Sequence, residues 1–294
     1  MPEKYIGLDI GASKINGVVF DGEIREQATQ AVLDRSDKEK ILKQIKEIIQ
    51  ELSVSYSEIK GIGVGLPGPL DFKKNIVSNP PNLTGLANVD LAEKLEKEFH
   101  VKTLVENDAN CAALAESLFG LGKGWEKGIL IMLTLGSGVG GGIVINNKIY
   151  HGSRGSAGEI GHMVINTDGP ECGCGLKGCL EAYASEKFIK RNSDLSPLEL
   201  EKRARAGDRE AIKIYADLGR WLGVGFGNLA NIFDPDIIVI GGGISHAGDL
   251  ILKTAKEKMK EMILSPLTRA NIKISQSKLG RDAGALGAAS LFLQ

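Results

Sequence analysis

Apolar and polar positions along the chain follow a pattern that occurs twice. Residues 5–24 and 130–149 align without a gap when the first stretch is shifted by 125 positions. Each copy has an apolar strand, a glycine turn, a second strand, a tight turn and a third strand, which is the pattern of an antiparallel meander. Asp21-Gly22 and Asn146-Asn147 occupy the tight turns, and both pairs are typical of type I′ hairpins. The repeat therefore predicts two similar structural units.

A helix and then a strand that ends in glycine are expected after each copy. In the first half the helix should begin at Ser36, because Ser36 and Glu39 form a capping box. The strand that follows should reach Gly65. The buried helix face is predicted from apolar residues at helical spacing, which are Ile41, Ile45, Ile48, Ile49 and Leu52.

The second half has the same order of elements with one more helix. Ser196 and Pro197 mark a helix start, since proline is favoured at the first helical position. Gly207 is expected to end this helix. A second apolar helix is predicted to run to about Asn231, and the next strand to reach Gly243.

The length of 294 residues suits two medium domains better than one core. We expect an α/β fold of two similar lobes that face each other across a cleft, with ligands bound where strand ends and glycine turns converge. The small N-terminal lobe is predicted to span residues 1–115, and the large C-terminal lobe residues 116–282. The last stretch, 283–294, contains a helix rich in Ala and Gly, and we expect it to return to the first lobe.

The charge of the chain is balanced, with 36 basic and 37 acidic residues and a sequence pI near 6.5. No basic excess would drive binding to nucleic acid, and no polybasic tail would bind a membrane surface. The uncharged run 128–145 is as long as a membrane span, but its glycines favour two buried strands around a turn. The N-terminus lacks the basic start and apolar stretch of a secretion signal, so we expect a cytoplasmic protein without a membrane partner.

Three of the four cysteines, Cys172, Cys174 and Cys179, lie within eight residues, and His162 precedes them by ten. A disulfide among them would leave one thiol unpaired, and in a reducing compartment such a cluster indicates a metal site. Three thiolates and one imidazole form the closed tetrahedral ligand set of a structural zinc ion. We therefore expect zinc to shape this loop without taking part in the chemistry.

Two acidic residues accompany the predicted zinc ligands. Glu159 lies three residues before His162, and Glu181 two residues after Cys179. An acid–His–acid group suits a polyhydroxylated ligand, because carboxylates accept hydrogen bonds from hydroxyls. A zinc-bound histidine normally donates its other ring N–H to a partner, and a substrate oxygen could be that partner.

Paired glycine turns are the candidates for phosphate binding. Residues 9–14 end the first strand of the first copy, and residues 134–140 are their counterpart in the second. Such turns can wrap backbone N–H groups around phosphates. Residues 136–141 also match the G-x-G-x-x-G dinucleotide fingerprint, but a strand follows where that fingerprint requires a helix. The chain lacks the Walker A motif and the H-R-D and D-F-G motifs of protein kinases.

Asp108 is the candidate for acid–base chemistry. It follows the apolar strand 101–105 and opens an Ala-rich helix. At such a junction an Asp often serves only as the helix N-cap, and taken alone this interpretation is favoured. In a phosphate-binding cleft the carboxylate instead suits the residue that accepts the proton of an attacking hydroxyl.

Short motifs run through nearly the whole chain. They are D-I-G-A-S-K at 9–14, G-L-P-G-P at 65–69, P-N-L at 81–83, E-N-D-A-N at 106–110, L-G-S-G-V-G-G-G at 135–142, G-E-I-G-H at 158–162, C-G-C-G-L-K-G-C-L-E at 172–181 and G-G-G-I at 241–244. In this order they resemble the ROK family of repressors, open reading frames and sugar kinases, and most closely its bacterial glucokinases. The resemblance implies the actin-like, hexokinase-type ATPase fold, with duplicated ribonuclease H-like lobes and a hinged cleft.

The resemblance also implies an activity, which is ATP- and Mg²⁺-dependent transfer of phosphate to the 6-hydroxyl of a hexose, with glucose the first expectation. Asp108 would be the general base, and Asp9 would hold Mg²⁺ through water. The other sugar contacts would come from Gly68, Asn82, Asn107, Glu159, His162 and Glu181. The ATP phosphates would face Gly11, Ser13, Lys14, Thr134, Gly136 and Gly138, and the adenosine would border Gly242 and Gly243. The structural zinc would be held by His162, Cys172, Cys174 and Cys179.

One departure from the family pattern lies in the first phosphate turn. Gly11-Ala12-Ser13 stands where the family usually shows Gly-Gly-Thr. Ser13 keeps the hydroxyl, but the methyl group of Ala12 would disfavour a positive φ at that position.

Several alternatives share these motifs. Kinases for N-acetylmannosamine, N-acetylglucosamine, mannose, allose and fructose carry them in the family, and polyphosphate could replace ATP as the donor. A sugar-responsive repressor of the family would need a helix-turn-helix before the first strand, which starts by Tyr5. A regulator that only binds sugar would be expected to lose Asp108, and an actin-like chaperone or filament protein has no use for the cluster around His162. Family members are commonly dimers or tetramers, so a homo-oligomer is expected.

The remaining histidines and the fourth cysteine receive structural interpretations. His100, His151 and His246 show no pattern of partners, and we expect them on the surface or in loops. Cys111 lies in an Ala-rich apolar stretch, which predicts a place in the core.

Overall fold

The computed structural model describes residues 2–56, 58–68, 70–71, 76–77, 80, 82–125 and 127–294. The chain divides into two compact units. Unit 1 consists of Met1–Gly124, Asn147–Ala157 and Arg281–Gln294, and unit 2 consists of Trp125–Asn146 and Gly158–Gly280. The segment Asn147–Ala157 therefore groups with the first unit, although it interrupts the second along the sequence.

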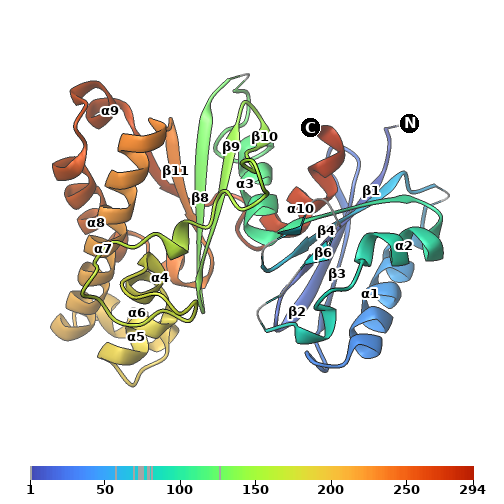
Figure 1. Ribbon diagram of the computed structural model, residues 1–294, viewed down its shortest axis with the longest axis horizontal. Coiled ribbons are helices and arrows are strands. Elements are labelled where there is room, and N and C mark those ends of the chain that lie inside the picture. Colours follow the sequence, from blue (N-terminus) through green and yellow to red (C-terminus); the bar gives the residue numbers. More distant parts are fainter. Residues whose placement is uncertain are drawn as a thin grey trace. The chain divides into compact units, whose positions relative to one another are not determined.

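Two five-stranded sheets of the same topology form the framework, and most of their strands are labelled in Figure 1. The first has the order β3-β2-β1-β4-β7, and the second β10-β9-β8-β11-β12. In each sheet the first strand along the chain pairs antiparallel with the second. The last two strands along the chain are added to the other side of the first strand, in parallel. The first sheet comprises β1 (Tyr5–Ile10), β2 (Lys14–Phe20), β3 (Ile24–Ala31), β4 (Gly61–Leu66) and β7 (Lys102–Asn107). The second comprises β8 (Ile129–Leu135), β9 (Val139–Ile145), β10 (Lys148–Ile149), β11 (Ile237–Gly241) and β12 (Lys273–Gln276).

The internal repeat predicted from the sequence is confirmed by these strands. The bounds of β2 and β9 differ by the predicted 125 positions at both ends. The uncharged run 128–145 forms β8 and β9, as expected. No helix in the described part of the chain is both long and apolar enough to cross a membrane. Strands β5 (Leu70–Asp71) and β6 (Ile76–Val77) form a separate short antiparallel pair.

The two tight turns of the repeat differ from each other. Asn146 and Asn147 have φ values of 53° and 62°, as a type I′ turn requires. The same prediction is wrong for Asp21-Gly22, because only Gly22 has a positive φ there. The register of β2 and β3 shifts between Val19 and Phe20, and this bulge changes the turn.

In unit 1, α1 (Lys38–Ser53) and α10 (Ala283–Ala289) cover opposite faces of the sheet. A Cβ on Gly17 would touch Leu52 of α1, whereas a Cβ on Gly7 would touch α10. Leu8 pairs with Gly17 and therefore shares its face, while Gly7 points the other way. The helices and 3₁₀ turns of this unit also include α2 (Leu91–Phe99), α3 (Asp108–Leu118), η1 (Thr84–Leu86) and η5 (Ser290–Leu293).

The start of α1 corrects one sequence prediction. The predicted face of α1 is buried as expected. However, the N-cap is Asp37, whose Oδ1 accepts from the backbone N–H of Glu39 and Lys40 at 3.0 and 3.1 Å. Ser36 does not cap the helix because its hydroxyl donates to Asp34 at 2.9 Å. Asp37 rather than Ser36 therefore takes the N-cap position. Its negative charge also stabilises the helix N-terminus electrostatically.

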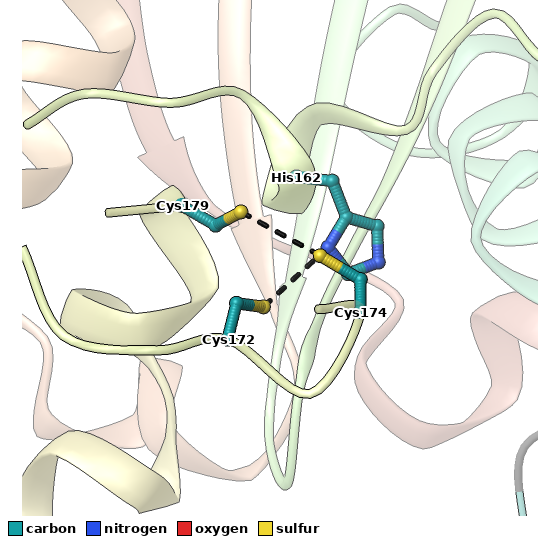
Figure 2. Close-up of side chains that lie close together, drawn as sticks. All are labelled: His162, Cys172, Cys174 and Cys179. Atoms are coloured by element: carbon teal, nitrogen blue, oxygen red, sulfur yellow. Dashed lines mark hydrogen bonds between the residues drawn. The ribbon is translucent and has the colours of Figure 1, made fainter. Parts of the chain in front are cut away.

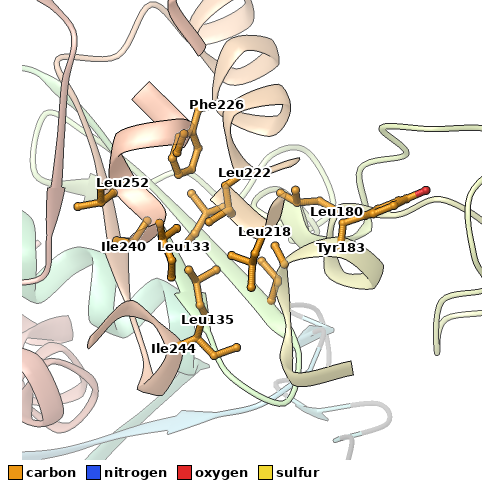
Figure 3. Close-up of a cluster of buried hydrophobic side chains, with 14 of the residues drawn as sticks. Leu133, Leu135, Leu180, Tyr183, Leu218, Leu222, Phe226, Ile240, Ile244 and Leu252 are labelled. Carbon is orange, nitrogen blue, oxygen red and sulfur yellow. The ribbon is translucent and has the colours of Figure 1, made fainter. Parts of the chain in front are cut away.

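The core of unit 2 lies between its sheet and α7 (Arg209–Phe233). Figure 3 shows Leu133 of β8 and Ile240 of β11 near Leu218, Leu222 and Phe226 of α7. Ser196 caps α6 (Pro197–Arg205) with proline at its start, as predicted, and Gly207 follows the helix end with a φ of 92°. The other helices and 3₁₀ turns in the described part of this unit are η2 (Ile160–His162), α4 (Leu180–Ala184), α5 (Glu186–Asn192), η3 (Gly243–Ala247), α8 (Asp249–Met262) and α9 (Pro266–Asn271).

The C-terminal segment packs closely on unit 1. Helix α10 lies on β1, β4 and α3. A Cβ on Gly63 of β4 would lie only 1.8 Å from the carbonyl oxygen of Ala288 in α10. Beyond the helix, the ring of Phe292 stacks on Tyr5 with 4.8 Å between ring centres. Because the helix touches strand backbone, its distance from the sheet is fixed by glycine rather than by flexible side chains.

We predict that Gly63→Ala destabilises unit 1. The new methyl group would meet backbone atoms of α10 that cannot move without shifting the helix, so the free energy of unfolding should fall by about 3 kcal/mol, the upper range for overpacking. Gly136→Ala is the matched control, because a Cβ there would meet no described atom within 4 Å. Urea unfolding of both variants measures the difference, and equal stabilities would contradict this account.

Candidate active site

The junction of β7 and α3 places Asp108 at the first position of a helix. The N-cap is Asn107, whose side-chain oxygen accepts from the backbone N–H groups of Ala109 and Asn110 at 2.9 and 3.2 Å. Asp108 therefore does not occupy the N-cap position, although its Oδ1 accepts from Ala109 N–H at 2.8 Å. The simple capping interpretation of Asp108 does not hold, and its carboxylate remains the candidate base.

Asn107 also connects to the preceding loop. Its side-chain NH₂ donates to the carbonyl oxygen of Gly68 at 3.2 Å. Gly68 has a φ of 107°, a conformation that favours glycine. Two predicted sugar contacts are thus held together with Asp108. Asn82, a third, is exposed and has a φ of 64° just before η1.

Asp9 is the next-to-last residue of β1 and interacts electrostatically with Asp108. The pKa of Asp9 is raised to about 7, mainly by burial and also by the negative charge of Asp108, while Asn16 and Lys14 act in the opposite direction. Asn16 is the cross-strand partner of Asp9, and the oxygen of its amide accepts from the hydroxyl of Thr29 at 3.2 Å. Sequence analysis missed Asn16, although the register of the predicted hairpin would have paired it with Asp9.

The first phosphate turn is closed by its own backbone. Gly11 N–H donates to the carbonyl oxygen of Lys14 at 3.0 Å. Ala12 is not among the residues with positive φ, so its methyl group causes no strain at this position. Lys14 lines a pocket of about 240 Å³ together with Asn16 and Arg281, all in unit 1.

The second phosphate turn and the glycines after β11 meet in unit 2. Gly136 N–H donates to Gly138 at 2.9 Å, and the carbonyl of Gly136 accepts from Glu186 N–H at 2.9 Å. Thr134 lies beside Gly241 in the sheet register. A Cβ on Gly242 would lie 2.4 Å from the carbonyl oxygen of Leu135, and its φ is 81°. Gly243 then begins η3. The predicted nucleotide contacts of this unit are therefore neighbours.

His162, Cys172, Cys174 and Cys179 converge in unit 2 and could hold a metal ion (Figure 2). Their ligand atoms all lie within 4.8 Å of one another. Cys172 Sγ is 3.7 Å from His162 Nδ1, and the sulfur atoms of Cys174 and Cys179 are also 3.7 Å apart. Burial raises the pKa of the Cys172 and Cys179 thiols, so these groups would become thiolates only with a cation bound beside them. The donor set fits zinc.

Glu181 joins the cysteine loop to the second phosphate turn. One carboxylate oxygen accepts from the backbone N–H of Val139 at 3.1 Å, and the other accepts from Lys187 Nζ at 2.8 Å and contacts Cys172 Sγ at 3.6 Å. Burial raises the pKa of Glu181, but the hydrogen bonds from Lys187 and Val139 outweigh it and leave the pKa below its ordinary value. Glu159 lies in the same unit, and its carbonyl oxygen accepts from His162 N–H at 3.1 Å. Sequence analysis did not identify Lys187.

The chain is similar to known proteins over nearly its whole length. The ROK family model matches residues 5–294. The chain belongs to the ROK family. A glucokinase from Thermotoga maritima is 37% identical over 99% of this chain and 98% of its own length. The structure of a ROK family glucokinase from Streptomyces griseus, in complex with glucose and AMPPNP, superposes with a TM-score of 0.84 at 32% identity and covers 98% of each chain.

Membership of the ROK family confirms the resemblance and the actin-like, hexokinase-type fold predicted from the sequence. The duplicated lobes of this fold also explain why the same sheet topology occurs twice. The family also contains a xylose repressor from Bacillus subtilis, which is 29% identical over 98% of this chain and 76% of its own length. Family membership alone therefore does not separate kinases from regulators, and the site must do so.

His151 lies in a loop and is partly exposed, as expected, and the structure adds a partner that the sequence pattern did not indicate. Its Nε2 lies 2.6 Å from Oε2 of Glu106. Glu106 is only 3% exposed, whereas the His151 side chain is partly exposed, so the contact lies at the edge of the interior of unit 1 in this ROK protein. The partners are 45 residues apart in the sequence, and no local pattern signals the pair.

We predict that Asp9 makes stability depend on pH in the metal-free protein. Its folded-state pKa of about 7 lies above the ordinary 3.8, so between these values the folded chain keeps a proton that the unfolded chain releases. The stability from this proton is full below about pH 4 and is lost as the pH rises to about 7, at roughly 1.4 kcal/mol per pKa unit.

Asp9→Asn should flatten this decline, because the amide does not titrate. Urea unfolding of both proteins without Mg²⁺ or nucleotide, at about pH 5 and about pH 8, measures the effect. The same loss of stability in both proteins would show that another group causes it.

Proposed function

We propose that this chain transfers the γ-phosphoryl group of ATP to the 6-hydroxyl of a hexose, with glucose as the main acceptor. The observation that carries the proposal is the carboxylate of Asp108, which opens α3 next to Asp9 while Asn107 performs the capping. A carboxylate at this position is available for proton transfer. Full-length similarity to glucokinases supports the same activity.

Asp108 would accept the proton of the sugar hydroxyl as that oxygen attacks the γ-phosphorus. Phosphoryl transfer relies mainly on positioning and charge stabilisation, so a carboxylate with an ordinary pKa can serve late in the transition state. The hydrogen bonds of the α3 N-terminus hold Asp108 in one place. Asn107, Gly68 and Asn82 would contact the sugar from the same unit.

Asp9 would hold Mg²⁺ through water, and the cation would neutralise charge on the ATP phosphates. Asp9 suits this task because its burial next to Asp108 leaves two carboxylates that a divalent cation can stabilise. Gly11, Ser13 and Lys14 would face the phosphates from the first turn. Thr134, Gly136 and Gly138 would do so from the second turn, with Gly242 and Gly243 bordering the adenosine.

Zinc would be structural in this scheme. Its four ligands leave no open coordination position for chemistry. The ion would fix the loop that presents Glu159, His162 and Glu181, which would bind sugar hydroxyls. The acceptor is set by the shape of this pocket near the 2-substituent, and an N-acetylhexosamine or another hexose in place of glucose would require different contacts there.

We predict that Asp108→Asn lowers kcat by roughly 10²–10⁴, the range for loss of a general base. The amide keeps the shape and the hydrogen bond to the helix but cannot accept the proton. The assay is ADP release from Mg·ATP with a panel of hexoses and N-acetylhexosamines, with polyphosphate as a second donor. Glucose should give the strongest signal.

Asp90→Asn is the matched control, because Asp90 caps α2 in the same unit and either side chain can cap a helix. This variant should keep the wild-type rate. Near-wild-type activity of Asp108→Asn would remove Asp108 from the role of base. No sugar-dependent release by the folded wild type would instead favour a sugar-sensing function.

We predict about one zinc ion per chain in protein purified without chelators, since there is one four-ligand cluster in the described part of the chain. Cys179→Ser should lose most of this zinc, because serine is a poor zinc ligand. Cys111→Ser is the matched control, since Cys111 belongs to unit 1 and is not a member of the cluster. Metal analysis that finds no zinc in the wild type would refute the zinc site.

A further inference from the structure

A buried carboxylate stands directly behind the proposed base. Glu106 is the residue before the N-cap of α3, and it is 3% exposed. One of its oxygens accepts from the backbone N–H of Asn107 at 2.8 Å and from the side-chain NH₂ of Asn110 at 3.0 Å. The other oxygen lies 2.6 Å from His151 Nε2. Because a carboxylate can only accept, His151 donates through Nε2–H.

The partners of Glu106 all belong to the structure that carries Asp108. Asn107 precedes the base, and Asn110 lies in the first turn of α3 behind it. The amide oxygen of Asn110 is buried and has no hydrogen-bond partner in the described part of the chain. The bond to Glu106 therefore orients this amide. A change in the position of Glu106 would be transmitted to both sides of Asp108 at once.

His151 supplies the hydrogen bond to the second oxygen of Glu106. A buried carboxylate is costly unless it is paired and fully hydrogen-bonded. His151 comes from Asn147–Ala157, the segment that returns to unit 1 between two parts of unit 2. Two further bonds hold this segment. Ser117 donates to the side-chain oxygen of Asn147 at 2.8 Å, and Ile149 N–H donates to the side chain of Gln294 at 3.0 Å.

We propose that His151 is a positioning residue for the general base, acting through Glu106 to fix the N-terminal turn of α3. The proposal rests on the assignment of Asp108 as base in the proposed function. His151 does not touch the reacting atoms in this scheme. Its removal should lower turnover and leave ATP binding nearly unchanged, since the ATP contacts come from other loops.

The experiment compares His151→Ala with His151→Gln. Alanine removes the donor, and kcat should fall by about tenfold while the KM for ATP changes by less than about threefold. Glutamine can place an N–H near the position of Nε2, so His151→Gln should recover most of kcat. A purely structural role would instead show both variants losing activity in proportion to lost protein stability.

Glu106→Gln completes a double-mutant cycle. If His151 acts through Glu106, the double variant should be no slower than the slower single variant, because the two residues form one unit. Losses that multiply would overturn the proposal, since they would mean independent effects.

Ser117→Ala is the matched control for the segment as a whole, because it removes another bond to Asn147–Ala157 without touching Glu106. It should keep wild-type kcat. If Ser117→Ala lowers kcat as much as His151→Ala, general attachment of the segment matters and the specific role of His151 is refuted.

Amide hydrogen exchange gives a readout that does not need activity. His151→Ala should accelerate exchange in the first turn of α3 by at least about threefold, with little change in α1. If turnover depends on Asp108 but His151→Ala changes neither exchange nor kcat, the positioning role alone would be overturned. Turnover that does not depend on Asp108 would overturn the proposed function, and with it the target of the positioning.

Discussion

The close contact between α10 and its neighbours in unit 1 is the constraint on which the proposed catalytic centre depends. A Cβ on Gly284 would lie 2.7 Å from the carboxylate carbon of Asp9, and a Cβ on Gly287 would lie 1.8 Å from the carbonyl oxygen of Cys111. Cys111 is one helical turn after Asp108. The same seven-residue helix therefore packs against the carboxylate of Asp9 and against the backbone of α3 one turn after Asp108. Because both contacts allow no side chain on the helix, the packing of Asp9 and α3 depends on glycines near the end of the chain.

This packing concentrates negative charge in a place with little water. Asp9 responds by a raised pKa, whose causes are burial and the charge of Asp108. Glu106 meets the same difficulty differently, because His151 and two N–H groups satisfy its oxygens. Asp9 has only Asn16 and Lys14 to favour its ionised form. The proposed mechanism assigns the cation to Asp9, which has fewer compensating partners than Glu106. This assignment agrees with the electrostatics, because a nearby cation favours the ionised carboxylate.

The sequence predicted those features that arise from local pattern. Repeated strands and turns predicted the antiparallel meander in each half, because burial and glycine turns have a clear period. The N-cap of α1 was harder to predict, because Ser36 and Asp37 are both good N-cap residues. Asp34 decides between them by accepting a hydrogen bond from the Ser36 hydroxyl. The ligand set of the metal cluster was visible because its members are close in sequence. His151 was not visible, because its partner Glu106 is brought near only by the tertiary fold.

The hydrogen bonds of Glu181 suggest that sugar binding and phosphate binding share a support in unit 2. Its carboxylate touches the cysteine loop through Cys172 and the second phosphate turn through Val139. A Cβ on Gly138 would lie 2.5 Å from the same carboxylate, so the turn can approach it only with glycine at this position. A change in the metal loop can therefore reach the phosphate turn through this buried side chain. Lys187 holds the other oxygen of that carboxylate and limits how far it can move. The loop that would recognise the sugar is thus connected to the turn that would hold the phosphates by the contacts of Glu181.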